Sequence, residues 1–356
     1  MYISEQSLHT VVTSILTAYG SSAAETRIVA DHLVMANLTG HDSHGAGMVP
    51  TYVKSIQAGL LKPNTPPVLV SDSGSIMVFD GQRGFGQRVA REAMDLALER
   101  CRETGLVLMA LRNAHHIGRV GSYGEQSIAA GLISLHFVNV TDHPPLVTPY
   151  NGAKARLLTN PLCFAMPATG QHPAALLDMA TSKIALGKAR VALLAGKPVD
   201  EGCLIDAQGL PATDPRVLLA DPRGALTPFG DYKGFGIAFF CEILAGALTG
   251  GGTIQPGNKV HGSIINNMLT IIVDPARLVD VDWMTQEIDA LTDYILDSPA
   301  IDETRGPVMI AGTPERQARA ERHRTGIPID ANTWQELQEA VRAVGLDPQL
   351  LPGPAS

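Results

Sequence analysis

The stretch Ser75-Ile-Met-Val-Phe-Asp-Gly-Gln-Arg-Gly-Phe-Gly-Gln-Arg-Val89 decides the fold, because it joins a predicted strand to a predicted helix through closely spaced glycines. It approaches the G-x-G-x-x-G dinucleotide fingerprint. However, Val89 replaces the third glycine, where close packing of helix on strand needs a small residue. No acidic residue ends a following strand to hold a ribose. We therefore expect a turn that needs a permissive backbone, and not a Rossmann site.

Around this stretch, strand and helix patterns alternate over residues 71–279. Apolar periodicity predicts strands at 75–79, 106–111, 133–140, 174–178 and 268–273, and helices at 89–101, 123–130, 184–195 and 234–248. The alternation is typical of a sheet covered by helices, so the expected fold class is α/β. The apolar run from Phe235 to Gly250 is too short for a membrane span, and Glu242 within it favours a core helix.

Helical patterns dominate both ends of the chain. The first 40 residues predict two amphipathic helices, with Ser22 and Glu25 at capping-box spacing before the second. Further helices are expected at 282–296, 314–325 and 332–344. Lys62-Pro-Asn-Thr-Pro-Pro67 breaks the chain. The simplest organisation folds residues 1–70 and 280–356 together as a helical domain, with an α/β nucleotide-binding domain of residues 71–279 inserted between them.

The composition excludes several classes of partner. The 356 residues include 27 Lys and Arg against 35 Asp and Glu, a net charge of −8, and no basic block. A nucleic-acid or anionic-membrane partner therefore has no electrostatic support. The 4 cysteines form no C-x-x-C pair, which indicates reduced thiols and neither a disulfide framework nor a zinc site. No basic-then-apolar leader opens the sequence, so we expect a cytoplasmic protein.

The segment His41-Asp-Ser-His-Gly45 gathers chemically capable side chains after an apolar helix. A solvated loop or a helix cap would explain it structurally. As an enzyme site, it could serve a metal-dependent hydrolase, a Ser/His hydrolase or a proton-transfer pair. In the pair, His44 exchanges a proton with a substrate oxygen that Ser43 hydrogen-bonds. The hydrolases have less support, because no G-x-S-x-G elbow is present and only His32 could add a metal ligand.

Two other segments carry candidate functional groups. His115 and His116 end a predicted strand before Gly118-Arg-Val-Gly-Ser-Tyr-Gly124, which opens a helix whose free N–H groups could face a phosphate. A plain glycine-rich cap is the competing interpretation. Lys233 begins a helix, where the dipole disfavours a cation unless an anion meets it. A solvated loop lysine is the alternative there.

These segments follow one another in a recognisable order. They are Asp42-Ser-His-Gly45 with Tyr52, Asn113-x-His115-His116-x-Gly118, Thr159-Asn-Pro161, Leu177-Asp-Met-Ala-Thr-Ser182, Lys233-Gly234, and Gly312-x-x-Glu315 with Gly326-Ile-Pro328. Together they resemble the type-2 malate/L-lactate dehydrogenase family over nearly the whole chain. The run His-Asp-Ser-His-Gly-Ala-Gly-Met is most similar to its hydroxycarboxylate dehydrogenase B branch.

The resemblance implies a homodimer, a nucleotide domain unlike Rossmann's, and hydride transfer between NAD(P)H and a 2-keto or 2-hydroxy acid. It implies that His44 donates and accepts the proton, assisted by Ser43, with His116 in the same cleft. The expected cofactor contacts are His44, Gly118, Arg119, Val120, Asp178, Met179, Ala180, Lys233, Asn267, Gly312, Thr313, Pro314 and Glu315. The expected substrate contacts are Met48, Tyr52, Thr141 and Thr159, and no metal is expected.

Met48 departs from the pattern of several relatives, in which an arginine at this position clamps the substrate carboxylate. Methionine cannot make those paired charge-assisted bonds. Either another base, such as Arg119, holds the acid, or the substrate has an apolar or aryl tail, which we favour. NAD is preferred over NADP, because no arginine cluster would hold a 2′-phosphate. A reductase of cyclic imino acids is the alternative within the family.

Overall fold

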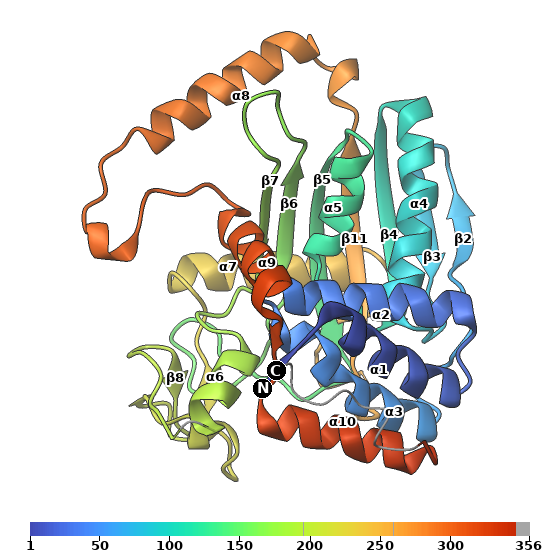
Figure 1. Ribbon diagram of the computed structural model, residues 1–356, viewed down its shortest axis with the longest axis vertical. Helices are drawn as coiled ribbons and strands as arrows, with labels where there is room; N and C mark the ends of the chain where they lie inside the picture. The colour runs from blue at the N-terminus through green and yellow to red at the C-terminus, as the bar shows by residue number, and fades with distance from the viewer. Residues whose placement is uncertain (195, 259, 347–356) are drawn as a thin grey trace.

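A seven-stranded sheet forms the centre of the computed structural model, which describes residues 1–194, 196–258 and 260–346 (Figure 1). Its order is β2-β3-β4-β11-β5-β6-β7. The strands are β2 (Val68–Asp72), β3 (Ile76–Asp80), β4 (Leu106–His115), β11 (Ile265–Val273), β5 (Ile133–Thr141), β6 (Leu162–Met166) and β7 (Ala175–Met179). Neighbours run antiparallel except β3 and β4, which are parallel. The mixed α/β class is confirmed, and the sheet is unlike a parallel Rossmann sheet.

Helices cover both faces of this sheet. Figure 1 shows α4 (Gly86–Thr104) and α5 (Gly121–Ala129) on the front face and α7 (Tyr232–Cys241) behind. An apolar core lies between the sheet and the two front helices, and includes Val89, Met109 and Met268. Because both faces are covered, β11 is buried nearly throughout and does not alternate between buried and exposed residues.

The predicted helix over 234–248 forms as α7 followed by a π-helical turn, Glu242–Ala247. The expectation of a core helix is wrong. Phe239, Phe240 and Leu248 are 49%, 61% and 62% exposed, since the sheet covers only one side of this helix. Among the described helices, none combines the length and the apolar character that crossing a membrane would need.

The chain ends meet below the sheet. The helices α1 (Glu5–Ala18), α2 (Ala23–Leu38), α3 (Val49–Gln57) and α10 (Ala331–Ala343) share one apolar core. Strand β1 (Tyr2–Ile3) pairs antiparallel with β12 (Ile327–Pro328), and α9 (Thr313–Thr325) lies against α2. Residue 195, the last of the predicted helix 184–195, and residues 347–356, the end of the predicted helical domain, lie outside the described residues. The division into two domains stays a prediction.

The helix α8 (Val281–Leu296) differs from the expected tail. It does not fold back onto the N-terminal helices but extends away from them, past the β6–β7 hairpin (Figure 1). Asp293 of α8 contacts His172 in that hairpin, with Oδ1 and Nε2 2.9 Å apart. Trp283, Leu291 and Tyr294 remain 56%, 59% and 80% exposed. The sequence predicts this amphipathic helix, but periodicity does not say what its apolar side faces.

Short elements complete the fold. A three-stranded sheet, β10-β8-β9, and α6 lie below the β6–β7 end. Their bounds, and those of the remaining short helices, are α6 (Leu186–Leu194), β8 (Leu204–Ile205), β9 (Pro211–Ala212), β10 (Ala225–Leu226), η3 (Pro215–Leu218), η5 (Pro275–Arg277) and η6 (Glu303–Arg305). The predicted capping box is only half formed. Ser22 Oγ accepts from the Glu25 amide, but the Glu25 carboxylate accepts from the Asn64 amide and pairs with Arg88.

Candidate active site

Ser43 and His44 lie in a 3₁₀ turn, η1 (Asp42–His44), which follows α2 and precedes η2 (Ala46–Met48). Asn37, buried at the end of α2, holds both turns. Its Oδ1 accepts from the Ala46 amide at 2.8 Å and its Nδ2 donates to Asp42 at 2.7 Å. A Cβ at Gly45 would lie 2.2 Å from the Asn37 oxygen. The asparagine and the glycine therefore fix this turn together.

A hydrogen-bonded chain leads inward from His44. Its Nδ1 lies 3.2 Å from His116 Nε2, and His116 Nδ1 lies 2.7 Å from the Tyr52 hydroxyl. Gln87 Nε2 then donates to that hydroxyl at 2.6 Å. The two imidazole rings stack with their centroids 5.3 Å apart. The turn η1, the end of β4, α3 and α4 each contribute one side chain, so the chain depends on the tertiary fold.

The glycine-rich stretch of residues 84–89 allows this convergence. A Cβ at Gly86 would lie 2.0 Å from the His115 carbonyl oxygen, so only glycine lets the start of α4 contact the end of β4. A Cβ at Gly84 would lie 2.3 Å from the Thr65 carbonyl oxygen. The permissive backbone that the sequence predicts is thus needed for close approach. It also brings Gln87, which no sequence motif marks, into contact with the Tyr52 hydroxyl.

Burial sets the protonation of the chain. Burial, together with the nearby charges of His41 and Arg119, lowers the pKa of His44 to about 4. It also lowers the pKa of His116 well below its ordinary value, with contributions from His44 and other histidines, and raises the pKa of Tyr52. All three side chains are therefore neutral at pH 7. A neutral chain can reverse its hydrogen bonds without leaving a buried charge.

A second group of expected residues meets where the loop before α5, the end of β7 and the start of α9 come together. Asp178 Oδ2 accepts from the Gly121 amide at 2.6 Å, so an acidic side chain occupies the first free N–H of α5. Arg119 Nη1 pairs with Glu125 at 2.9 Å, and its Nε lies 3.9 Å from Asp178. At the start of α9, Glu315 Oε1 lies 3.4 Å from His41 Nε2, beside the turn that carries His44.

Unpartnered donors make this group a candidate site for a dinucleotide. The Arg119 side chain is fully buried, yet its Nε and Nη2, like Ser122 Oγ, have no hydrogen-bond partner among the described residues. Gly118 has a φ of 75°, and a Cβ at Gly121 would lie 2.8 Å from Arg119 Nη2. Donors that face a cradle too tight for side chains suit phosphate oxygens, and Asp178 suits a ribose hydroxyl. These residues would hold NAD(P).

The other expected residues lie at or near the ends of helices and strands. Val120 is buried in the loop before α5, Met179 ends β7 beside Asp178, and Ala180 follows the strand. Gly312, at a φ of 88°, caps α9, whose first turn holds Thr313 and Pro314. The carbonyl of Thr159 accepts from the Thr181 amide at 2.8 Å, just beyond β7. Lys233 is exposed at the start of α7, with Nζ 6.0 Å from the ring centre of Tyr232.

Two expected ligand contacts are buried. Tyr52 is 0% exposed and lies behind His116, so it can reach a substrate only through that histidine. Asn267 is 0% exposed as well, and its amide bonds to the Asn113 N–H and to Asn139. Its role at a cofactor would be indirect. Buried polar side chains and ligand contacts look alike in a sequence, because both are polar residues among apolar ones.

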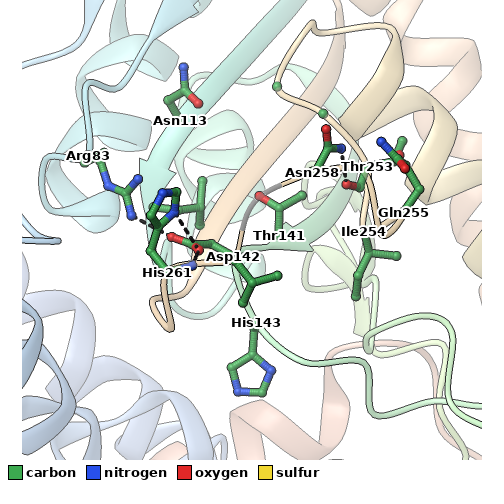
Figure 2. A pocket seen from close by; sticks show the side chains of 14 residues that line it. Arg83, Asn113, Thr141, Asp142, His143, Thr253, Ile254, Gln255, Asn258 and His261 are labelled. Carbon is green, nitrogen blue, oxygen red and sulfur yellow. Dashed lines mark hydrogen bonds and ion pairs between the residues drawn. The ribbon is translucent and has the colours of Figure 1, made fainter.

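Thr141 lines a separate pocket of about 240 Å³, which Figure 2 shows. Arg83 Nη2 pairs with Asp142 at 2.6 Å, and His261 Nδ1 lies 3.1 Å from the same carboxylate. Neither His44 nor His116 lines this pocket. The structure thus brings His44, His116 and Tyr52 together and places Thr141 at another opening.

The His, Cys, Asp and Glu side chains bear on metal and thiol chemistry. Over residues 1–194, 196–258 and 260–346, no group of three His, Cys, Asp or Glu side chains could hold a metal ion. Cys101, Cys163, Cys203 and Cys241 are free and buried, as the sequence predicts.

Known proteins resemble this chain over its whole length. Residues 3–338 match the profile of the malate/L-lactate dehydrogenase family. Hydroxycarboxylate dehydrogenase B of Escherichia coli K12 is 42% identical over 97% of this chain and 95% of its own, and an L-lactate dehydrogenase of Cupriavidus necator is 39% identical over 97% and 99%. A solved structure from E. coli superposes with a TM-score of 0.93 at 41% identity, covering 99% of this chain and 97% of that one.

Proposed function

Because the chain belongs to the malate/L-lactate dehydrogenase family, we propose that it interconverts 2-keto and 2-hydroxy acids with an apolar or aryl side chain, using NAD. Its class is that of the family, an NAD(P)-dependent dehydrogenase acting on 2-hydroxycarboxylates. The observation that carries the proposal is the hydrogen-bonded His44–His116–Tyr52 chain, whose outer end lies in the turn directly before η2, which contains Met48. The family excludes the hydrolase alternatives.

The hydrogen-bond chain fixes which nitrogen of His44 carries the hydrogen for the reduction. Gln87 donates to the Tyr52 oxygen, which leaves the hydroxyl hydrogen for His116 Nδ1. His116 then donates from Nε2 to His44 Nδ1, so the neutral His44 carries its hydrogen on Nε2. That N–H can hydrogen-bond the oxygen of a keto acid, as can the Ser43 hydroxyl. The proton that completes the alcohol is one that His44 takes up from solvent, so that the imidazolium delivers it from Nε2 and returns to the neutral form. A bound nicotinamide would supply the hydride.

The oxidation needs the opposite arrangement, with a lone pair on His44 Nε2 to accept the hydroxyl proton. Reversing every hydrogen bond in the chain provides it, and Tyr52 then donates to Gln87. Gln87 Oε1 is buried and has no hydrogen-bond partner among the described residues, so an acceptor is available after rotation of the amide. The pKa of His44, lowered to about 4 by burial, keeps the imidazole neutral for this task at pH 7.

The surroundings of Met48 support an apolar substrate tail. Arg119, the other base considered for the carboxylate, is buried and paired with Glu125 and Asp178. Arg83 is paired with Asp142. Arg119 is assigned above to the cofactor group, and Arg83 is held by Asp142, so neither guanidinium replaces an arginine at position 48, whereas the half-buried side chain of Met48 offers an apolar contact. A monocarboxylate with an apolar side chain fits this set better than a dicarboxylate.

The acidic side chains of the cofactor group support NAD over NADP. Asp178 is buried beside the α5 N-terminus, and Glu315 approaches the same region from α9. A 2′-phosphate would add negative charge near these carboxylates, whereas a ribose hydroxyl could donate to one of them.

An assay panel tests the proposed function. The purified protein is supplied with NADH or NADPH and with pyruvate, phenylpyruvate, oxaloacetate or a cyclic imino acid. We expect kcat/KM to be at least about tenfold higher for phenylpyruvate than for oxaloacetate, and higher with NADH. A preference for oxaloacetate would contradict the apolar tail, and activity on the cyclic imine alone would assign an imine reductase.

The exposed apolar residues of α7 and α8 support a homodimer. Phe240, Leu248, Leu291 and Tyr294 are each about 60% exposed or more, which is a large apolar surface for a free monomer. Sedimentation of the wild type should give twice the chain mass of 37.7 kDa. The double variant Leu291→Glu/Tyr294→Glu should sediment as a monomer. A wild type that remains monomeric at micromolar concentration would rule the dimer out.

A further inference from the structure

The helix α9 contacts the segment that leads into the catalytic turn. At one end, Glu315 approaches His41, with Oε1 and Nε2 3.4 Å apart. In the middle, a Cβ at Gly40 would lie 3.5 Å from the Ala318 Cβ. At the other end, Arg322 reaches Asp42, the first residue of η1. Since positions 315, 318 and 322 are spaced i, i+3, i+7, they form one face of the helix, aligned along residues 40–42.

Both terminal nitrogens of the Arg322 guanidinium contact the Asp42 carboxylate. Nη1 lies 2.6 Å from Asp42 Oδ1 and Nη2 lies 3.0 Å from Oδ2, which is the paired geometry of an arginine–carboxylate fork. Nη1 also donates to the Asn37 carbonyl oxygen. The Arg322 side chain is only 18% exposed. A lysine could supply the charge but not the fork, so the geometry is specific to arginine.

Asp42 is therefore held from two sides. Asn37 donates to Oδ1 from the interior at 2.7 Å, and Arg322 pairs with both carboxylate oxygens from α9. Ser43 and His44 follow directly in the same turn. His44 also needs its Nδ1 within hydrogen-bonding distance of His116, so a small rotation of the turn would break the proton chain. Displacement of a reacting group by about 1 Å can cost about 10²-fold in rate.

We propose that Arg322 is a positioning residue for the reaction, and that its fork on Asp42 fixes the turn that carries Ser43 and His44. This inference rests on the roles proposed above for those two residues. The first turn of the same helix, with its cap Gly312, holds the expected cofactor contacts Gly312–Glu315, so one helix borders both the cofactor group and the catalytic turn. Arg322 itself touches neither substrate nor cofactor.

Replacement of Arg322 by methionine tests the proposal, because methionine keeps much of the stem and removes the fork. We expect kcat for phenylpyruvate reduction to fall about 10- to 100-fold, with KM within about threefold of the wild type. The matched control is Arg324→Met, which removes the same charge from an exposed position in the same helical turn. Its kcat should stay within about twofold. Arg322→Lys should recover part of the lost kcat, since one charged contact remains.

A double-mutant cycle tests whether Arg322 acts through Asp42. If Arg322 acts through Asp42, the variant Arg322→Met/Asp42→Asn should lose no more kcat than the worse single variant. Fully multiplicative losses would overturn the proposal, as would wild-type kcat in Arg322→Met or equal losses in Arg324→Met. If Arg322→Met does not fold, Asp42→Asn and Arg322→Lys carry the same test.

The variant His44→Ala, assayed beside these variants, distinguishes failure of the proposed catalytic role of His44 from failure of the positioning role of Arg322. Wild-type turnover in His44→Ala would remove the proposed catalytic role. A large loss in His44→Ala together with an unchanged Arg322→Met would remove only the positioning role.

Discussion

Replacing His44 by alanine is expected to lower kcat for phenylpyruvate reduction by about 10²–10⁴, the usual loss when a general acid is removed. The imidazole is the outer end of a hydrogen-bonded chain, and alanine leaves His116 Nε2 without its partner. Cofactor affinity should weaken only moderately, because the buried donors of Arg119 and Ser122 do not depend on His44. Steady-state kinetics and NADH titration by fluorescence measure the two effects separately.

Tyr52→Phe is the control for this prediction, since it removes the far end of the chain and keeps the ring and the catalytic imidazole. It should cost less than His44→Ala. The pH profile is a second check. Because the pKa of His44 is lowered to about 4, kcat/KM for oxidation should be level from pH 6 to 8 and fall only toward that value as the base is protonated. Wild-type turnover in His44→Ala, or an acid limb near neutral pH, would contradict the assignment.

Most of the secondary structure follows from local patterns. The strands β3, β4, β5, β7 and β11 and the long helices have apolar periods that a sequence displays. β2 was not predicted, because all five of its residues are exposed and it has no buried face to create a pattern. The two-residue strands β8, β9 and β10 are too short to show a period. The exposed sides of α7 and α8 were missed for a different reason. Composition records that a helix is apolar but not which neighbour covers it.

Some residues of the candidate site can be recognised in the sequence and others cannot. His44, His116 and Arg119 stand out because histidine and arginine beside glycine-rich turns are unusual in a plain loop. No local pattern marks Gln87 or Arg322, since their partners lie 35 and 280 residues away in the sequence. No motif marks Asn37 either, although its partner Asp42 is only 5 residues away. Two signals were nevertheless available. Gln87 directly follows a glycine of the rejected fingerprint, and Arg322 shares a helix face with Glu315.

Met48→Arg is expected to reverse the substrate preference. An arginine at this position would offer a dicarboxylate the fork that Met48 cannot. A charge-assisted pair contributes about 1.5–3 kcal/mol, or roughly 10- to 10²-fold in kcat/KM for oxaloacetate. Phenylpyruvate should lose activity, because a guanidinium would replace the apolar contact. The oxaloacetate-to-phenylpyruvate ratio of kcat/KM should therefore rise by about 10²–10³.

Met48→Leu is the matched control, since it keeps an apolar side chain of similar volume and should leave the ratio within about threefold. The comparison separates charge from packing, because Met48 also lies against the core of the helical ends, where either change could disturb η2. If Met48→Arg lowered kcat/KM for both acids equally, the position would affect only the turn. If the wild type already preferred oxaloacetate, the carboxylate would need another base. Arg119 and Arg83 would then have to leave the acidic partners they hold in this structure, Glu125 and Asp142.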